Sequence, residues 1–289
     1  MASTQVLKLR IRSVKNTKQI TKAMQLVAAS KMRRAQETTK ASAPYTLAAR
    51  ELLTSLSRHT STSGHPLFLI KPVKQRLIIV IASDKGLAGA YNSSVVKMYA
   101  EQLQIDDKAG IKNQTITIGR KASQFAARIK NTEVIGSYED LSDRPEGLEF
   151  RTILDTARNK FISGNVDAVD IIFTEFISSI KQEVKLVRVL PAGFVETDGA
   201  AISDESAYEP SASAVLDGIA YRLIGAQIFQ ALLEARASEH SMRMLAMKNA
   251  SDNATDLIDD LTLAMNKARQ GAITQELAEI SGGVEALNE

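Results

Sequence analysis

The sequence predicts an α/β protein in which the first and last helices pair as a long antiparallel coiled coil, with a small open sheet inserted between them. Two observations support this architecture: an apolar repeat of helical spacing near the carboxyl end, and a central stretch in which β-branched runs alternate with amphipathic segments. We expect an amino-terminal coiled-coil helix over residues 1–60, an α/β domain over 73–195 and a carboxyl-terminal coiled-coil helix over 211–289.

The carboxyl-terminal segment carries the clearest pattern. It contains no proline after position 210, and positions taken alternately three and four apart from 216 to 272 are almost all apolar. This spacing is the a/d seam of a left-handed coiled coil, kept for about eight heptads. At about 1.5 Å per residue the helix would be about 110 Å long, which is more than a compact domain can use. The polar positions, which we interpret as register-setting rather than as ligands, are Gln230, His240 and Ser251.

The amino-terminal segment is the predicted partner helix. Residues 4–43 contain neither glycine nor proline, and Pro44 is expected to kink or end the helix. The shift between two apolar registers predicts a stutter, which would unwind the supercoil locally. These registers are Leu7, Ile11 and Val14, followed by Ile20, Met24 and Val27.

Charge is segregated between the two ends. Residues 1–36 carry nine Lys and Arg and no acid, whereas residues 252–289 carry eight acids against Lys267 and Arg269. These charges are complementary along a shared seam, but a surplus of cations remains. We therefore expect an acidic surface on a partner.

The central stretch predicts a Rossmann-like open sheet, mostly parallel, because strands and helices alternate along it. Residues 76–83 are β-branched and apolar, as in a strand that is buried on both faces. Further strands are expected at 114–119, 133–135, 168–176 and 185–190, and helices at 93–104, 121–130 and 148–163.

The loop at residues 83–92 follows the first strand, where nucleotide-binding α/β proteins hold phosphate. Its Gly86 and Gly89 match neither G-x-G-x-x-G nor G-x-x-x-x-G-K-[ST]. We therefore attribute these glycines to turn geometry and close packing rather than to phosphate binding.

Composition excludes several kinds of site. The chain has no cysteine and only three histidines, so it offers no thiolate chemistry and no histidine-rich metal site. No pair of carboxylates and no serine–histidine arrangement suggests catalysis. The basic amino-terminal helix lacks aromatic residues before Tyr45 that could stack on bases, which favours a protein partner over nucleic acid. No apolar run is long enough to span a membrane, so membrane association is expected only through partners.

Three parts of the chain resemble one family, in the family's own order. Residues 11–36 closely resemble the first helix of the gamma subunit of F-type ATP synthases, and residues 83–89 (SDKGLAG) resemble its S-D-x-G-L-C-G motif. Residues 243–254 and 266–280 resemble its final helix. The resemblance covers essentially the whole chain, although residues 95–210 match in pattern only.

The resemblance implies a non-catalytic rotary shaft. The paired helices would turn inside a hexamer of alternating alpha and beta subunits, while the α/β domain would rest on a membrane ring of c subunits and hold the epsilon subunit. Ion flow through the ring would then drive the catalytic beta subunits through their conformational cycle in ATP synthesis or hydrolysis. This chain would need no cofactor and no metal.

The resemblance also implies contacts with beta. Lys22 and Met24 match positions where the first helix meets the final helix and an acidic loop of beta. The part of the final helix beyond its paired seam should stand alone inside the hexamer. Four polar positions near the upper part of the shaft match further contacts with beta: Arg269, Gln270, Thr274 and Glu276.

Two features bear on location and on rival functions. Ala88 replaces the family's usual cysteine, and a cysteine-free chain cannot carry the redox switch of the chloroplast forms. The sequence of the first helix resembles bacterial members of the family more than mitochondrial ones. It therefore predicts that the protein lies at the cytoplasmic face of a bacterial plasma membrane; the alternative is the matrix side of the mitochondrial inner membrane. Two rivals stay open: a stand-alone α/β enzyme that uses the loop of Gly86 and Gly89 and dimerises through its helices, and a nucleic-acid-binding coiled coil.

Overall fold

The chain divides into two compact units, one made of residues 1–28 with 244–289 and one made of residues 29–243. We call the first the helix-pair unit and the second the α/β unit. Two helices, α1 (Thr4–Ser57) and α5 (Ala212–Leu287), contribute to both. The computed structural model describes residues 4–57, 65–130, 132–142, 147–193 and 212–287.

The α/β unit is built on a five-stranded sheet of order β3-β2-β1-β4-β5. The first four strands run parallel, and the last pairs antiparallel with β4. Each predicted strand overlaps an observed one, so the predicted open, mostly parallel sheet is confirmed. The strands are β1 (Gln75–Ile81), β2 (Lys112–Ile118), β3 (Thr132–Tyr138), β4 (Ala168–Phe176) and β5 (Gln182–Leu190).

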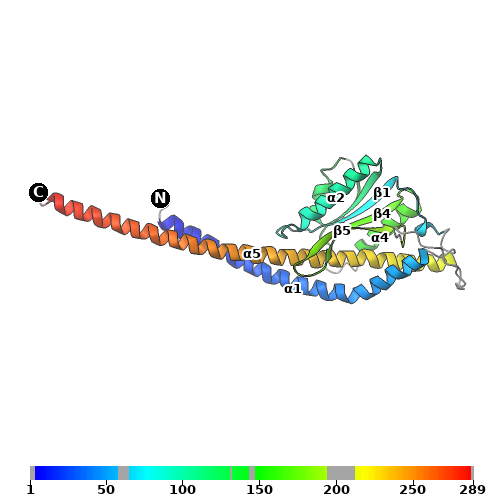
Figure 1. Ribbon diagram of the computed structural model, residues 1–289, viewed down its shortest axis with the longest axis horizontal. Helices are drawn as coiled ribbons and strands as arrows, with labels where there is room; N and C mark the ends of the chain where they lie inside the picture. The colour runs from blue at the N-terminus through cyan, green and yellow to red at the C-terminus, as the bar shows by residue number, and fades with distance from the viewer. Residues whose placement is uncertain (1–3, 58–64, 131, 143–146, 194–211, 288–289) are drawn as a thin grey trace. The chain divides into compact units, whose positions relative to one another are not determined.

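Helices cover both faces of this sheet. One face packs on α2 (Tyr91–Lys108) and α3 (Arg120–Ala126). The other packs on α4 (Leu148–Ile162), on the short 3₁₀ helix η2 (Pro66–Phe68) and on the parts of α1 and α5 that belong to this unit. Figure 1 shows α2 and α5 on opposite sides of the sheet.

Strand β1 is buried on both faces, which explains its continuous apolar run. Ile78 and Val80 pack in the cluster that contains α2 and α3. Leu77, Ile79 and Ile81 pack in the cluster that contains the long helices, because successive side chains of a strand point to opposite faces. The middle strand thus anchors both layers of the unit.

Helix α1 continues through Pro44 and ends only at Ser57. Of the two predicted outcomes, a stop is therefore wrong, and the second half of the ribbon bends instead (Figure 1). Proline lacks the N–H that bonds the carbonyl four residues earlier, and its ring crowds that turn, so a bend is the expected response. Ala49 and Leu53, beyond the proline, are 1% and 0% exposed in the core, and this packing stabilises the continued helix.

In the helix-pair unit the two helices run in opposite directions, as predicted (Figure 1). The seam of α5 keeps the predicted register here, because its positions are buried or half-buried in turn. These are Met247, Ser251, Ala254, Ile258, Leu261, Met265 and Ala268.

The predicted stutter in α1 is wrong. Of the residues that defined the second register, Ile20 and Val27 are 60% and 58% exposed, and only Met24 is half-buried. The register of Leu7 and Ile11 continues without a shift. The face of α1 that it defines packs on α5 in this unit largely through small or polar side chains. Small residues let two helices approach closely, and a long polar residue can pack its stem while its head stays in water, so this face has no apolar signature. Its further buried or half-buried positions are Val14, Lys18, Thr21, Gln25 and Ala28.

Candidate functional site

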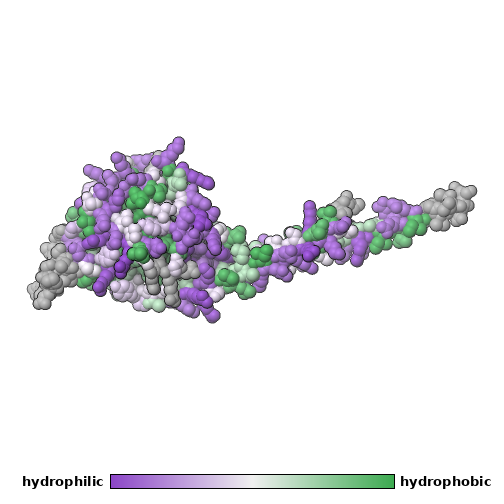
Figure 2. All heavy atoms as spheres, turned by 180° about the vertical axis from the view of Figure 1, so that it is seen from behind, coloured by the Kyte–Doolittle hydropathy of each residue, from purple (hydrophilic) through white to green (hydrophobic). Residues whose placement is uncertain are grey.

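The last part of α5 stands without a partner helix among the described residues. Every residue from 269 to 281 is exposed. Ile273, Leu277 and Ile280 are 50%, 60% and 64% exposed, and their spacing of four and three residues places them in one stripe along the helix. Figure 2 shows apolar side chains exposed among polar ones along the helices of this unit. A stripe of this kind on an isolated helix is suited to contact with another protein.

The four polar residues predicted for this stretch flank the apolar stripe. Helical spacing places Arg269 and Glu276 along one edge, and Gln270 and Thr274 along the other. Thr274 Oγ1 donates a hydrogen bond to the carbonyl oxygen of Gln270 at 2.9 Å. No ion pair involves Arg269 or Glu276 within the described part of the chain. An apolar strip with a polar rim is the usual anatomy of a protein interface, and the role of these residues toward beta stays a prediction.

Lys22 and Met24 lie on the paired part of the helices rather than at this lone end. Lys22 is exposed, and its Nζ donates a hydrogen bond to Gln25 Oε1 at 3.2 Å. Met24 is half-buried. Residues two apart on a helix point to different sides, so these side chains do not form one patch. The structure therefore divides the six predicted contact residues into separate groups.

Within the described part of the helix-pair unit, α5 does not neutralise the cations of α1. Within residues 4–28 and 244–281, no Lys or Arg of α1 forms an ion pair. The predicted charge complementarity thus produces no ion pair between the two helices in these ranges. One side of α1 instead presents exposed cations at spacings of four, three and seven residues, namely Lys8, Arg12, Lys15 and Lys22.

In the α/β unit, the loop after β1 is held by α5. Arg243 Nη2 donates to the carbonyl oxygen of Lys85 at 3.0 Å, and its Nε donates to that of Gly86 at 3.4 Å. Arg243 Nη1 donates to Glu239 Oε1 at 2.8 Å. The loop thus turns carbonyl groups toward a cation, whereas a phosphate cradle needs converging N–H groups. This geometry argues against phosphate binding here.

Asp84 provides the second anchor of the same loop. Its Oδ1 accepts hydrogen bonds from the backbone N–H groups of Arg120 and Asp140, both at 3.0 Å. Its Oδ2 lies 3.6 Å from Arg236 Nη2, and Arg236 also pairs with Glu239 at 3.1 Å. Loop, sheet edge and long helix are therefore joined by one network of largely buried charges.

The sequence pattern did not point to the helix side of this network. Arg236, Glu239 and Arg243 follow one another at three and four residues and so share one face of α5. The signal present in the sequence is the spacing of these three charges, which places them on one face of a helix.

The two glycines of the loop differ. Gly89 has a φ of 56°, in the left-handed region that favours glycine. Gly86 has no atom within 4 Å of the position that a Cβ would take, so close packing does not explain it. Leu87 also has a positive φ, 61°, which is rare for a residue with a bulky side chain, and it is 63% exposed. Ala88 is 2% exposed, which agrees with a packing role for the position where the family usually has cysteine.

A second group of buried charges is structural. Arg76 Nε lies 2.9 Å from Asp106 Oδ2, and Asp170 bonds both Arg76 and Arg188. Burial raises the pKa of Asp106.

In the described ranges, no cluster of three or more potential ligands is arranged for a metal ion. Among the helices that the structure describes, none combines the length and the apolar character needed to cross a bilayer.

Comparison with known proteins assigns the family. A protein-family model described as ATP synthase matches residues 3–287. The ATP synthase gamma chain of Stenotrophomonas maltophilia (strain R551-3) is 39% identical over 289 residues, which cover 99% of this chain and 100% of that protein. The gamma chain of an Exiguobacterium species (strain ATCC BAA-1283 / AT1b) is also 39% identical, over 287 residues that cover 99% of this chain and 100% of that one.

Solved structures share the fold. One is a structure of OSCP, F1 and the c-ring from the mitochondrial ATP synthase of Euglena gracilis. A chain in it matches with a TM-score of 0.69 at 18% identity, and the match covers 98% of this chain and 94% of that chain. A chain from the central stalk and c-ring of the Tetrahymena thermophila mitochondrial enzyme has a TM-score of 0.63 at 24% identity and covers 80% of this chain and 99% of its own. With full-length relatives at this identity, the chain belongs to the ATP synthase gamma chain family.

Proposed function

We propose that this gamma chain transmits torque between a membrane ring of c subunits and a hexamer of alpha and beta subunits, without catalysing a reaction itself. The observation that supports this most directly is the lone end of α5. Every residue from 269 to 281 is exposed there, and the surface consists of an apolar stripe flanked by polar residues. An isolated helix with such a surface needs a surrounding protein. A hexamer that encloses it meets that need.

The contacts with beta are proposed at both groups of predicted residues. Arg269, Gln270, Thr274 and Glu276 would meet the hexamer around the apolar stripe. Lys22 and Met24, with the unpaired cations beside them on α1, would face an acidic loop of beta. Exposed ion pairs contribute only about 0–1 kcal/mol each, and contacts of that strength can be made and broken as the shaft turns. A tightly bonded orientation would stall the next step.

The remaining partners are assigned to the α/β unit. We infer that it contacts the c-ring and the epsilon subunit. The c-ring contact is supported by the similar solved structures, one of a central stalk with a c-ring and one of OSCP, F1 and a c-ring. Membrane association would then occur only through partners. The bacterial relatives support a position on the cytoplasmic face of a bacterial plasma membrane.

The two rival functions receive no support from the described residues. A nucleotide-binding enzyme would need converging N–H groups in the loop after β1, but the Lys85 and Gly86 carbonyl groups point instead to Arg243. A nucleic-acid-binding coiled coil would use the cations of α1, but no aromatic residue accompanies them before Tyr45.

Reconstitution tests the coupling role. The chain would be co-expressed with the alpha and beta subunits of its own organism, and ATP hydrolysis would be compared with and without it. We expect the assembled complex to lose most of its hydrolysis when the chain is omitted. Equal activity of the two preparations would contradict the role. Turnover of nucleotide by the purified chain alone would support the enzyme rival, and salt-sensitive duplex binding would support the other.

A further inference from the structure

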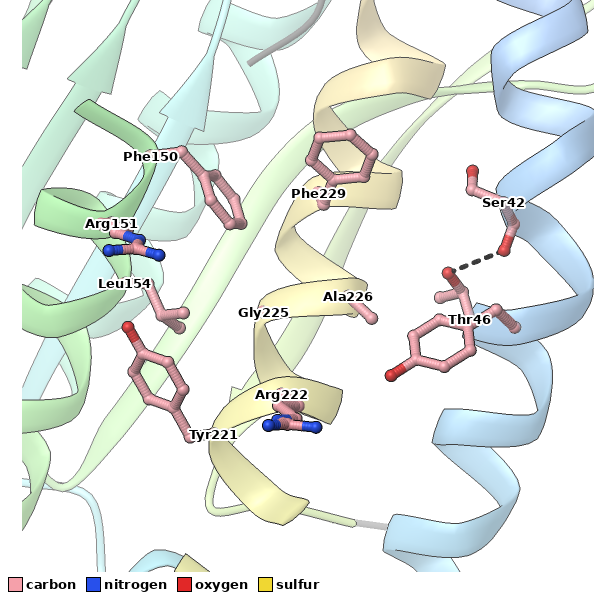
Figure 3. Close-up of a pocket in the computed structure, with 11 residues that line it drawn as sticks. Ser42, Thr46, Phe150, Arg151, Leu154, Tyr221, Arg222, Gly225, Ala226 and Phe229 are labelled. Carbon is pink, nitrogen blue, oxygen red and sulfur yellow. Dashed lines mark hydrogen bonds between the residues drawn. The ribbon is translucent and has the colours of Figure 1, made fainter. Parts of the chain in front are cut away.

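A groove of about 560 Å³ opens between α1, α4 and α5 within the α/β unit. Its floor is apolar and includes Leu154, Gly225 and Ala226. Phe150 and Phe229 meet there edge to face, with ring centroids 5.7 Å apart (Figure 3). A volume of this size lies in the range of about 300–1,000 Å³ found for binding pockets in proteins.

Gly225 contributes to the depth of the groove because it has no side chain. A Cβ at this position would lie 3.1 Å from Leu154 Cδ2, so α4 and α5 approach each other over the glycine. Glycine inside a helix costs about 1 kcal/mol relative to alanine. The groove is therefore shaped by a residue that helix stability alone would disfavour.

Two cations stand at the rim without a carboxylate. Arg151 on α4 and Arg222 on α5 are exposed, and no ion pair involves either of them among the residues that the structure describes. The nearby acids are already engaged. Asp155 Oδ1 accepts a hydrogen bond from the Tyr221 hydroxyl at 2.9 Å, and Asp217 pairs with Arg158 at 3.2 Å. Arg151 and Arg222 therefore favour an occupant that carries negative charge.

The apolar surface extends past the groove itself. Tyr45, at the rim on α1, is 57% exposed, and Leu148, one turn before Arg151 on α4, is 81% exposed. A single small molecule would leave these side chains uncovered. An amphipathic helix covers such a surface, with apolar side chains three or four residues apart on the floor and carboxylates beside them.

We propose that this groove is the docking site for an acidic amphipathic helix of a neighbouring subunit. Apolar side chains of that helix lie on Leu154, Ala226 and Phe229, and its carboxylates pair with Arg151 and Arg222. The proposal rests on the function proposed above, because it requires that the chain works inside a complex. It adds a site within the α/β unit, whereas the residues predicted to contact beta belong to the helix-pair unit.

The absence of cysteine makes the groove directly testable. The chain contains no cysteine, so a single introduced thiol reports on one position. Thr46→Cys places the thiol in the groove, and Leu47→Cys places it on the next residue, which is 61% exposed and does not line the groove. Maleimide labelling of each variant would be measured on the isolated chain and on the purified, coupled ATP synthase. We expect assembly to slow labelling of Thr46→Cys by more than about tenfold relative to that of Leu47→Cys, as complete burial of a central interface position requires.

Charge reversal and cross-linking identify the occupant. Arg151→Glu with Arg222→Glu is expected to lower retention of one neighbouring subunit by about tenfold or more, the scale for loss of a close interfacial charge pair. Arg50→Glu, an exposed arginine of α1 outside the groove, is the matched control and should retain that subunit. A photoreactive phenylalanine derivative at Tyr45 should cross-link to an acidic helical segment of the same subunit.

Three outcomes would overturn the docking proposal. One is equal labelling of Thr46→Cys in the isolated chain and in the coupled complex. Another is protection of the isolated chain by a small amphipathic anion, tested with dodecanoate, without protection in the complex. The third is protection that grows with the concentration of the isolated chain, which indicates a second copy. A coupled complex that leaves Thr46→Cys reactive contradicts only the docking site, whereas hydrolysis that is independent of this chain contradicts the rotor function.

Discussion

Arg243 on α5 and Lys85 in the loop after β1 are joined by a 3.0 Å hydrogen bond between the guanidinium and the backbone carbonyl. The same guanidinium bonds Glu239, which also pairs with Arg236. Because Arg236 lies beside Asp84, α5 holds the first part of the loop, residues 84–86. In a shaft, we expect this network to transmit force from the sheet to α5.

Arg243→Gln should loosen the loop. Hydrogen bonds to a charged group contribute about 1.5–3 kcal/mol, so we expect a loss of about 2 kcal/mol in the free energy of unfolding. Lys85 then becomes a faster site of tryptic cleavage, and the ratio of ion pumping to hydrolysis falls in the assembled enzyme. Lys248→Gln, an exposed position farther along α5, serves as the control. Unchanged cleavage at Lys85 would show that Arg243 does not hold the loop.

Asp170→Asn should be among the most destabilising single changes in the α/β unit. Asp170 is 0% exposed and bonds both Arg76 and Arg188, so the substitution removes the charge that these two arginines share. Breaking a buried ion pair from one side costs about 3–5 kcal/mol. Urea unfolding, followed by circular dichroism, measures the change. Glu101→Gln, which removes an exposed pair with Lys97, should cost less than about 0.5 kcal/mol, and a similar small cost at Asp170 would contradict the prediction.

Asp106 should make stability depend on pH in an unusual direction for a carboxylate. Burial raises its pKa above the ordinary value of 3.8, so the folded chain holds this proton more tightly than the unfolded chain does. The resulting stabilisation is fully present below the unfolded pKa and is lost as pH rises through the folded value. Asp106→Asn keeps a neutral side chain at every pH.

We therefore expect the free energy of unfolding of Asp106→Asn, relative to the parent chain, to rise from about pH 4 toward neutrality. Parallel urea titrations at several pH values measure the difference. A difference that stays constant, or that falls as pH rises, would mean that Asp106 does not titrate in this way.

The contact face of α1 can be tested by two adjacent changes. Val27 is 58% exposed and Ala28 is 2% exposed. Val27→Ser should therefore change the free energy of unfolding by no more than about 0.5 kcal/mol. Ala28→Leu should overpack the site and cost about 1–3 kcal/mol. Thermal unfolding of the full chain measures both changes. A larger loss of stability for Val27→Ser than for Ala28→Leu would support the stutter that the sequence predicts.

The difference between Val27 and Ala28 also shows what the sequence could reveal. Strands such as β1 and the seam of α5 were predictable because burial on a fixed face requires apolar residues at a fixed period. The contact face of α1 uses Lys18, Thr21 and Ala28, which pack by small size or by an aliphatic stem, so its most apolar residues lie elsewhere. The loop network escaped prediction for another reason: Asp84 and Arg236 are far apart in sequence, and only the fold brings opposite charges together.

The division into helical arms and an inserted domain, and the contacts of the predicted residues with beta, stay predictions. The structure places Arg269 and Thr274 on two edges of one exposed stripe. That arrangement suits a partner that surrounds the helix, and a measurement with the hexamer tests it.

Leu277→Gln provides that measurement. Leu277 is 60% exposed at the centre of the stripe, so the change should leave the free energy of unfolding of the isolated chain within about 0.5 kcal/mol of the parent value. Loss of an apolar anchor from an interface costs about 1–2 kcal/mol. The affinity of the chain for the alpha–beta hexamer, measured by fluorescence titration, should therefore fall about tenfold. Ala278→Gln changes the next residue, on a different side of the helix, and should bind as the parent does. Equal affinities of the two variants would contradict an interface along this stripe, because only one of them alters it.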